Sequence, residues 1–193
     1  MNPSKAAAFC GAPARAAFVL SSYHLRPLCL VFGLALALGA PAFASSPMQV
    51  YEARVTRVFD GDTLWVKPLE GGRYRKLRLD GLDAPEICQT GGEPSRDALA
   101  ARVLQQVVTV QVLSRDDYGR ALVRLSHGGE DVGAVLVRQG HAWSYRWRDS
   151  EGPYEREEQA ARAARSGVFA AQSPERPRDF RRRHGPCPLP PRP

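Results

Sequence analysis

Three carboxylates and two arginines stand at turns and strand ends, where they could do chemistry together. They are Asp62, Asp83, Glu86, Arg78 and Arg120. Carboxylate oxygens bind hard divalent cations or accept a proton from water. A guanidinium can contact two oxygens of one anion at once. A single acid in a loop is more often a solvated turn former, so these residues indicate a functional site only together with the motifs around them.

The elements that must position these residues are short strands joined by tight turns. Alternating apolar residues and turn dipeptides predict five strands, over residues 49–58, 63–66, 73–79, 107–113 and 120–125. Helical periods predict three helices, over residues 94–106, 132–139 and 154–165. One helix follows the third strand and two follow the fifth. This order predicts a mainly β fold of the α+β class, a five-stranded OB-fold barrel with about three α-helices.

The net charge of +7 is concentrated at the two ends of the chain. Residues 1–44 carry +3 and residues 173–193 carry +4, whereas residues 45–172 hold 18 bases and 18 acids. Global steering of a polyanion is therefore weak, and an anion site must come from locally placed arginines. The composition, with 44% apolar and 24% charged residues, is that of a globular domain. It excludes disordered, collagen-like and coiled-coil chains, and the short apolar runs exclude a polytopic membrane protein.

Residues 1–44 are expected to be a signal peptide. The 13-residue apolar run Leu28 to Ala40 follows basic residues, and Ala42 and Ala44 place small side chains at the −3 and −1 positions of a cleavage site. We expect cleavage after Ala44, which leaves 149 residues in the periplasm or outside the cell. The segment before the apolar run is long for a signal peptide. An uncleaved anchor, a misplaced start codon and a buried helix are therefore the alternatives.

Two cysteines, Cys88 and Cys187, remain after this cleavage. In an oxidising compartment two lone cysteines most often pair. We therefore expect a disulfide that attaches the Pro-rich and Arg-rich tail, residues 173–193, to the loop after Glu86. Two free thiols are the alternative. A metal site at these cysteines is disfavoured, because no second Cys or His stands at ligand spacing. The tail itself is expected to be extended rather than folded.

Four ordered motifs in this sequence resemble the staphylococcal (micrococcal, or thermonuclease) nuclease family. They are Asp-Gly-Asp-Thr at 60–63, Arg-Leu-x-x-x-Asp-x-Pro-Glu at 78–86, Asp-x-Tyr-Gly-Arg at 116–120 and Leu-Val-Arg-Gln-Gly at 136–140. The resemblance covers about residues 50–170, so a nuclease-like OB-fold domain is expected over residues 45–172. It implies hydrolysis of DNA and RNA phosphodiesters with Ca²⁺ and low sequence specificity, leaving 3′ phosphates.

The resemblance assigns the metal ligands and the base. By their match to the family's motifs, Asp62 and Asp83 supply carboxylates to Ca²⁺, and Ala84 supplies a backbone carbonyl. The family archetype has Thr at the position of Ala84, and the change to Ala keeps the carbonyl. Glu86 matches the general base that takes a proton from the attacking water.

The resemblance also assigns residues that contact nucleic acid. Arg78 and Arg120 match the two phosphate-binding arginines, whose planar fork a lysine cannot copy. Tyr118 matches a tyrosine near the second nucleotide phosphate, and Tyr145 is the candidate for the base-stacking aromatic. The expected partners are DNA and RNA, with single-stranded or denatured substrate favoured. No obligate protein partner is expected, and no membrane after signal cleavage.

The sequence departs from the family archetype at two places near the expected site. The loop of residues 86–94 is shorter than the archetype's mobile, Lys-rich loop and contains Cys88. A disulfide there would limit motion near Glu86 and couple activity to oxidation. Asp117 replaces a lysine, which lowers the expected affinity for a polyanion, and the Arg181–Arg183 run is the candidate to restore part of it.

Two other classes of function compete with this interpretation. A non-catalytic OB-fold module would bind single strands by stacking and backbone charge. Such a module has no need of all five ionic residues together, and this chain has them all. A partner-binding envelope protein stabilised by the tail would hydrolyse nothing in any metal. We therefore expect a hydrolase, a phosphodiesterase or endonuclease of the thermonuclease type.

Overall fold

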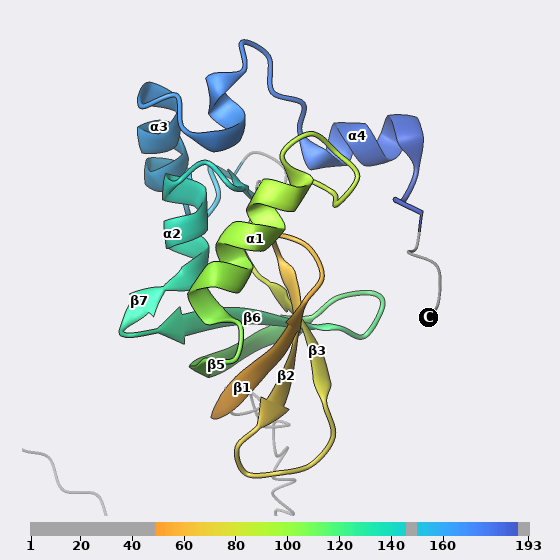
Figure 1. Ribbon diagram of the computed structural model, residues 1–193, viewed down its shortest axis with the longest axis vertical. Coiled ribbons are helices and arrows are strands. Elements are labelled where there is room, and N and C mark those ends of the chain that lie inside the picture. Colours follow the sequence, from red (N-terminus) through yellow and green to blue (C-terminus); the bar gives the residue numbers. More distant parts are fainter. Residues whose placement is uncertain (1–48, 146–149, 189–193) are drawn as a thin grey trace, which may run out of the picture. The chain divides into compact units, whose positions relative to one another are not determined.

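Five strands close into a barrel in the computed structural model, which describes residues 49–145 and 150–188 (Figure 1). Neighbouring strands pair antiparallel in the order β3-β2-β1-β5-β6, and a parallel pairing of β3 with β6 closes the barrel. The expected α+β fold with a five-stranded barrel is therefore confirmed. The expected signal peptide lies outside the described residues. The strands are β1 (Val50–Val58), β2 (Thr63–Pro68), β3 (Arg75–Leu79), β5 (Val107–Arg115) and β6 (Ala121–His127).

Period-two alternation explains why these segments form a barrel. In β1, Tyr51, Ala53 and Val55 are buried while the residues between them are exposed or partly exposed. The same alternation in β6 buries Ala121, Val123 and Leu125. The buried faces of all five strands meet in one hydrophobic core, because successive side chains of a strand point to opposite faces of the sheet.

Three short strands extend or flank the barrel. β7 (Glu130–Asp131) pairs with the end of β6. β4 (Leu82–Asp83) pairs antiparallel with β8 (Trp143–Ser144), outside the main sheet. This second pairing fixes Asp83 opposite Trp143 and brings the segment after β8 near the segment after β3.

The three expected helices are confirmed with shifted ends. They are α1 (Gly92–Val103), α2 (Val132–Arg138) and α3 (Glu155–Ala163), and a 3₁₀ turn, η1 (Gly167–Ala170), follows α3. The Asp131 side chain caps α2 by accepting a hydrogen bond from the amide of Ala134 at 3.2 Å. α2 packs against β6, α1 and α3. No helix within residues 49–145 and 150–188 is long and apolar enough to cross a membrane.

The expectation of an extended tail is wrong for residues 177–184, which form a fourth helix, α4 (Pro177–His184). Pro177 occupies the first turn, where its fixed φ suits a helix and its missing N–H is no loss. Asp179 lies in the first turn and basic residues fill the last, so both ends complement the helix dipole. The extended tail was expected from the overall richness in Pro and Arg, which does not reveal these position-specific helix signals.

Candidate active site

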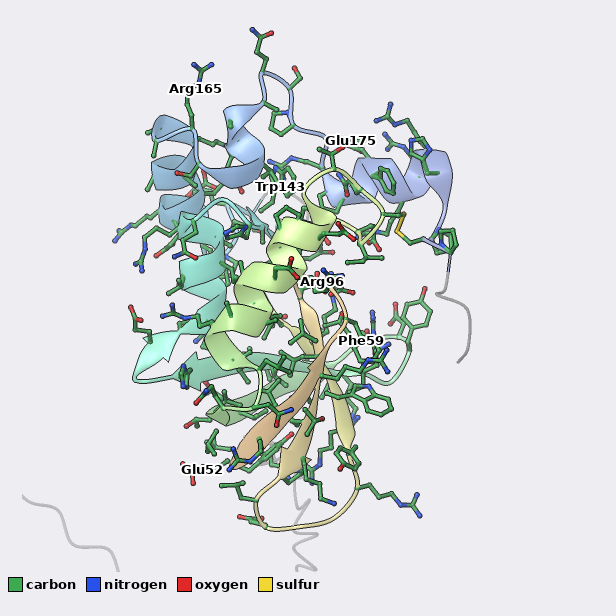
Figure 2. All side chains as sticks on the ribbon, viewed as in Figure 1. Glu52, Phe59, Arg96, Trp143, Arg165 and Glu175 are labelled. Carbon is green, nitrogen blue, oxygen red and sulfur yellow. A yellow bond between two sulfur atoms is a disulfide. The ribbon has the colours of Figure 1, made fainter. Side chains whose placement is uncertain are left out.

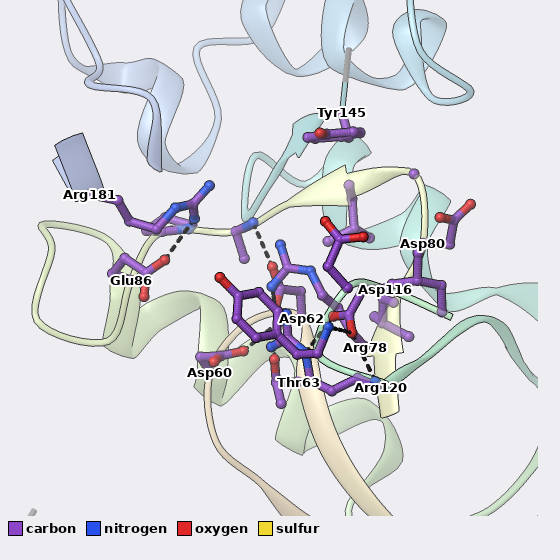
Figure 3. A pocket seen from close by; sticks show the side chains of 18 of the residues that line it. Asp60, Asp62, Thr63, Arg78, Asp80, Glu86, Asp116, Arg120, Tyr145 and Arg181 are labelled. Atoms are coloured by element: carbon purple, nitrogen blue, oxygen red, sulfur yellow. Dashed lines mark hydrogen bonds and ion pairs between the residues drawn. The ribbon is translucent and has the colours of Figure 1, made fainter. Parts of the chain in front are cut away.

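A cavity of about 600 Å³ opens where the turn after β1, the end of β3 and the turn after β5 meet (Figure 3). Seven of the eight residues expected in catalysis, metal binding and substrate binding line it. These seven are Asp62, Arg78, Ala84, Glu86, Tyr118, Arg120 and Tyr145. The eighth, Asp83, is 6% exposed and connects to the cavity through the arginines bonded to it.

The turn that carries Asp62 is held in a close approach to the segment after β4. The Asp60 carboxylate accepts a hydrogen bond from the amide of Asp62 at 3.0 Å, which shapes the turn. A Cβ on Gly61 would lie 2.7 Å from the Cβ of Ala84, so only glycine fits there. This approach allows the amide of Ala84 to donate to Oδ2 of Asp62 at 3.2 Å. Asp62 and the backbone of Ala84 are thus joined directly.

Arg78 links the two buried aspartates. Its Nη1 donates to Oδ1 of Asp62 at 2.7 Å, and its Nη2 donates to Oδ1 of Asp83 at 3.1 Å. The two carboxylates therefore converge within reach of one guanidinium. Burial raises the pKa of Asp62 to about 6, although Arg78 acts in the opposite direction. The pairing of Arg78 with these acids was not anticipated, because the sequence indicated each residue's type but not its neighbours in space.

A third arginine, Arg181 of α4, enters the site. Its Nη1 donates to Oε1 of Glu86 at 2.7 Å (Figure 3). Nη1 also donates to Oδ1 of Asp83 at 3.2 Å, and Nη2 donates to Oδ2 of Asp83 at 3.2 Å. From the sequence, Arg181 was expected only as part of a basic run, Arg181–Arg183, that restores some affinity for a polyanion. One sequence signal could have located Arg181. It lies six residues before Cys187, the cysteine expected to bond to the loop after Glu86.

The expected disulfide is present and explains how α4 reaches the site. Cys88 and Cys187, 99 residues apart in sequence, are bonded. The loop between Glu86 and Cys88 is also braced by Gln89, whose side-chain oxygen accepts from the amide of Glu86 at 3.2 Å. The Gln89 amide group donates to the carbonyl of Glu175 at 2.8 Å. The backbone that carries Glu86 is therefore tied to the C-terminal segment by the disulfide and by the hydrogen bond of Gln89.

Asp116 organises the turn between β5 and β6, a role the sequence did not assign. Its carboxylate accepts from the amides of Tyr118 at 3.0 Å and Arg120 at 2.8 Å, and from Nε of Arg120 at 2.6 Å. Arg120 is thus oriented through Nε. Among the described residues, no protein acceptor is bonded to its two Nη groups. They are therefore free to contact an anion in the cavity.

The two expected substrate-binding tyrosines are exposed at the cavity. Tyr118 is 86% exposed, and the Arg120 guanidinium lies 5.5 Å from the centre of its ring. Tyr145 lines the cavity from the segment after β8, where its amide donates to the carbonyl of Gly81 at 2.9 Å (Figure 3). Exposed aromatic rings beside arginines are suited to stacking on bases next to a bound phosphate.

The fold and the site together define a small β-barrel protein with buried carboxylates and arginines at one opening of the barrel. The chain belongs to the staphylococcal nuclease family. A family model described as "Staphylococcal nuclease homologue" matches residues 76–171. Four of the five ionic residues lie within this match, and Asp62 precedes it.

Similar proteins come from bacteria and plants. The chain is 32% identical over 129 residues to an "Uncharacterized endonuclease" of Haemophilus influenzae, covering 67% of this chain and 72% of that protein. It is 35% identical over 159 residues to "Protein ParB" of Escherichia coli, covering 77% of this chain and 89% of that protein. It is also 33% identical over 110 residues to "Probable staphylococcal-like nuclease CAN4" of Oryza sativa subsp. japonica, covering 57% of this chain and 22% of that protein. The chain spans only 32% of a 38.1 kDa protein of Capnoides sempervirens that it also matches.

Proposed function

We propose that this protein is an exported, Ca²⁺-dependent nuclease that hydrolyses phosphodiester bonds of DNA and RNA with low sequence specificity, leaving 3′ phosphates. One observation carries the proposal. Asp62, Arg78, Glu86 and Arg120 line one cavity, and Asp83 joins them through its bonds with Arg78 and Arg181. Membership of the staphylococcal nuclease family and the names of two relatives, a nuclease and an endonuclease, support the same reaction.

The donor chemistry at the site fits Ca²⁺. The proposed ligands are the carboxylates of Asp62 and Asp83 and the carbonyl of Ala84, all of them oxygens, which hard cations prefer. Within residues 49–145 and 150–188, no three His, Cys, Asp or Glu side chains are arranged to hold a metal ion. The protein would therefore supply only part of the six to eight oxygens that Ca²⁺ takes, and water and substrate the rest. The bound ion would neutralise phosphate charge and favour ionised water.

The side chains have separate tasks in the proposed reaction. Glu86 takes a proton from the water that attacks phosphorus. Arg120, held through Nε by Asp116, directs its free Nη groups to the non-bridging oxygens, and Arg78 neutralises the charge beside them. The bond to the 5′ oxygen breaks, this oxygen takes up a proton from solvent water and leaves as a hydroxyl, and the phosphate stays on the 3′ side. Tyr118 and Tyr145 hold the flanking nucleotides.

The first test is hydrolysis of heat-denatured DNA and of RNA by the purified protein. Activity with Ca²⁺ should disappear with EGTA, and Glu86→Gln should lower the rate by about 10²- to 10⁴-fold. Glu93→Gln is the matched control, because Glu93 is an exposed carboxylate in the first turn of α1. Equal hydrolysis with Ca²⁺, with EGTA and by Glu86→Gln would remove the proposed mechanism. Binding of single strands without hydrolysis in any metal would instead support the non-catalytic module.

Export is a separate part of the proposal and has its own test. The apolar run of residues 28–40 and the small residues before Ser45 support cleavage after Ala44. The protein recovered from the periplasm or the medium should begin at Ser45 by N-terminal sequencing. A protein that begins at Met1 and stays in the cytoplasm would contradict export without affecting the nuclease proposal.

A further inference from the structure

Three aromatic rings form a row on the outer surface of the barrel. They are Phe59, Trp65 and Tyr74. The rings of Phe59 and Trp65 meet edge to face with centroids 5.8 Å apart, and Trp65 stacks with Tyr74 at 6.4 Å. Trp65 is 39% exposed and Tyr74 57% exposed. Figure 2 shows Phe59 on the flank of the barrel that lies opposite α2 and α3. We call these three residues the aromatic row.

Three cations accompany the aromatic row. Arg57 lies 4.7 Å and Lys76 lies 5.1 Å from the ring centre of Phe59, and Lys67 lies 4.9 Å from that of Tyr74. Lys67 also donates to the carbonyl of Gly72 at 2.6 Å. Within the part of the chain that the structure describes, none of these three cations forms an ion pair with a carboxylate. Most arginines elsewhere in the described chain do pair with an acid. The three cations therefore keep their charge available for an outside anion.

Strand register connects the aromatic row to the candidate active site. In β2, Leu64 and Val66 face the core, so Thr63, Trp65 and Lys67 share the opposite face. Thr63 pairs with Arg78 of β3, and Trp65 pairs with Lys76 two residues further along. Since residues two apart in a strand are separated by about 6.6 Å, the row begins one step from Arg78. A nucleic-acid strand that leaves the cavity across β2 and β3 therefore reaches the aromatic row.

Stabilisation of the sheet alone does not account for the aromatic row and its cations. Single apolar side chains are common on protein surfaces, and cross-strand aromatic pairs stabilise sheets. Here, however, three adjacent rings and three cations without carboxylate partners follow one face to the active cavity. Aromatic rings interleaved with cations bind single-stranded nucleic acid, because every unpaired base offers a face for stacking and every phosphate a charge.

We propose that the aromatic row and its cations Arg57, Lys67 and Lys76 are a second binding surface for single-stranded nucleic acid. The strand that flanks the cleaved phosphate lies along β2 and β3, with its bases on Trp65 and Tyr74 and its phosphates at the lysines. The inference rests on the proposed nuclease function and specifies its substrate class. The preferred substrate is an unpaired strand long enough to reach from Arg78 to Tyr74, because paired bases do not expose their faces to the rings.

Binding of a fluorescein-labelled oligothymidylate to the full-length Glu86→Gln protein with Ca²⁺ tests stacking without cleavage. The strand has about 12 nucleotides, a length of the order of one such binding site. Trp65→Ala should weaken its binding by about fivefold or more. Trp65→Phe, which keeps a ring, should restore most of the affinity. Leu113→Ala is the matched control, because Leu113 is equally exposed at 39% but lies on β5. If Trp65→Ala fails to fold, Tyr74→Ala answers the same question from the adjoining turn.

The salt dependence of the same binding tests the phosphate contacts. Lys76→Gln should reduce the slope of log affinity against log salt by about 0.7, the value for one contact to a single strand. Arg165→Gln removes the same charge at the far end of the molecule from Phe59 (Figure 2) and should leave the slope unchanged. Equal slopes for wild type, Lys76→Gln and Arg165→Gln would contradict the lysine contact.

Hydrolysis of two substrates separates this inference from the nuclease proposal. Trp65→Ala should raise KM for a long single strand about fivefold and leave a dinucleotide substrate unaffected, because the dinucleotide does not reach the row. If the wild-type protein cleaves neither substrate but Trp65→Ala still weakens binding, the nuclease proposal fails and the surface stands. If Trp65→Ala and Tyr74→Ala bind the long strand as tightly as wild type, the surface is overturned whatever the activity.

Discussion

Arg181 Nη1 donates a hydrogen bond to Oε1 of Glu86 at 2.7 Å, although the two residues are 95 apart in the chain. The same guanidinium contacts both carboxylate oxygens of Asp83. The C-terminal helix α4 thus places a positive charge on the proposed base and on a proposed metal ligand. This charge competes with a cation for the same carboxylates.

Replacing Arg181 with Gln should therefore increase the affinity for Ca²⁺. Removal of a like charge beside the metal ligands, discounted for its partial exposure, should lower the Ca²⁺ concentration at half-maximal activity by about three- to tenfold. The measurement is activity against Ca²⁺ concentration. Arg182→Gln is the control, because the Arg182 side chain is solvent-exposed and pairs with Asp179 rather than with the site. An unchanged half-maximal concentration would indicate that Arg181 does not oppose the metal.

Removing the disulfide should produce the same shift in Ca²⁺ affinity together with a loss of stability. The Cys88 to Cys187 bond closes a long loop, so the Cys88→Ser/Cys187→Ser protein should lose about 2–4 kcal/mol of unfolding free energy. It should also loosen α4 and release Arg181 from Glu86. Urea unfolding measures the first effect and a Ca²⁺ titration the second. Adding Arg181→Gln to this double variant should give no further gain in Ca²⁺ affinity, because both changes remove the same contact.

The barrel could be predicted from the sequence because its signals are local. Alternation in β1 and β6 and the turn at Asp60-Gly61 depend on residues close together in the chain. The contact of Arg181 with Glu86 could not be predicted. It depends on α4, which forms in a Pro-rich segment, and on the direction in which the disulfide holds this helix. The pairing of Arg78 with Asp62 was missed for a similar reason. Residue types identify candidates, but only the folded backbone decides which charges neutralise one another.

Arg78→Lys should abolish most activity although it keeps the positive charge. The Arg78 fork bonds Asp62 and Asp83 at once, and a single ammonium cannot span both with the same geometry. We expect the turnover rate to fall about 100-fold or more, comparable with the loss of one preorganised charge contact in an enzyme. Arg96→Lys, in an exposed pair with Asp97, serves as the control. A fully active Arg78→Lys protein would show that the fork geometry is unimportant.

Gly92→Ala should displace the loop that carries Glu86. A Cβ at residue 92 would lie 2.0 Å from the carbonyl oxygen of Glu86, so this backbone must move. We expect a large fall in turnover together with reduced thermal stability. Gly128→Ala separates the two effects, because Gly128 has a positive φ of 58° but open space around it. That control should lose about 1 kcal/mol of stability at full activity, whereas equal activity of both variants would contradict the displacement.

Glu158→Gln should destabilise the fold next to the site. The side chain is fully buried, and its Oε2 accepts from the amide of Ser144 in β8 at 2.8 Å. Its Oε1 accepts from Nη2 of Arg162 at 2.7 Å and lies 3.5 Å from Nη2 of Arg176.

The Arg162 and Arg176 side chains are 41% and 39% exposed and stay partly solvated. Loss of the buried Glu158 charge should therefore cost about 1–2 kcal/mol, the value of its charge-assisted hydrogen bonds discounted for that exposure. Urea unfolding should show that loss, while Glu157→Gln, a partly exposed neighbour in α3, should change stability by about 0.5 kcal/mol or less. Because Ser144 pairs with Leu82, one residue before Asp83, Glu158→Gln should also weaken Ca²⁺ binding. If stability falls and Ca²⁺ affinity does not, β8 supports the barrel without positioning Asp83.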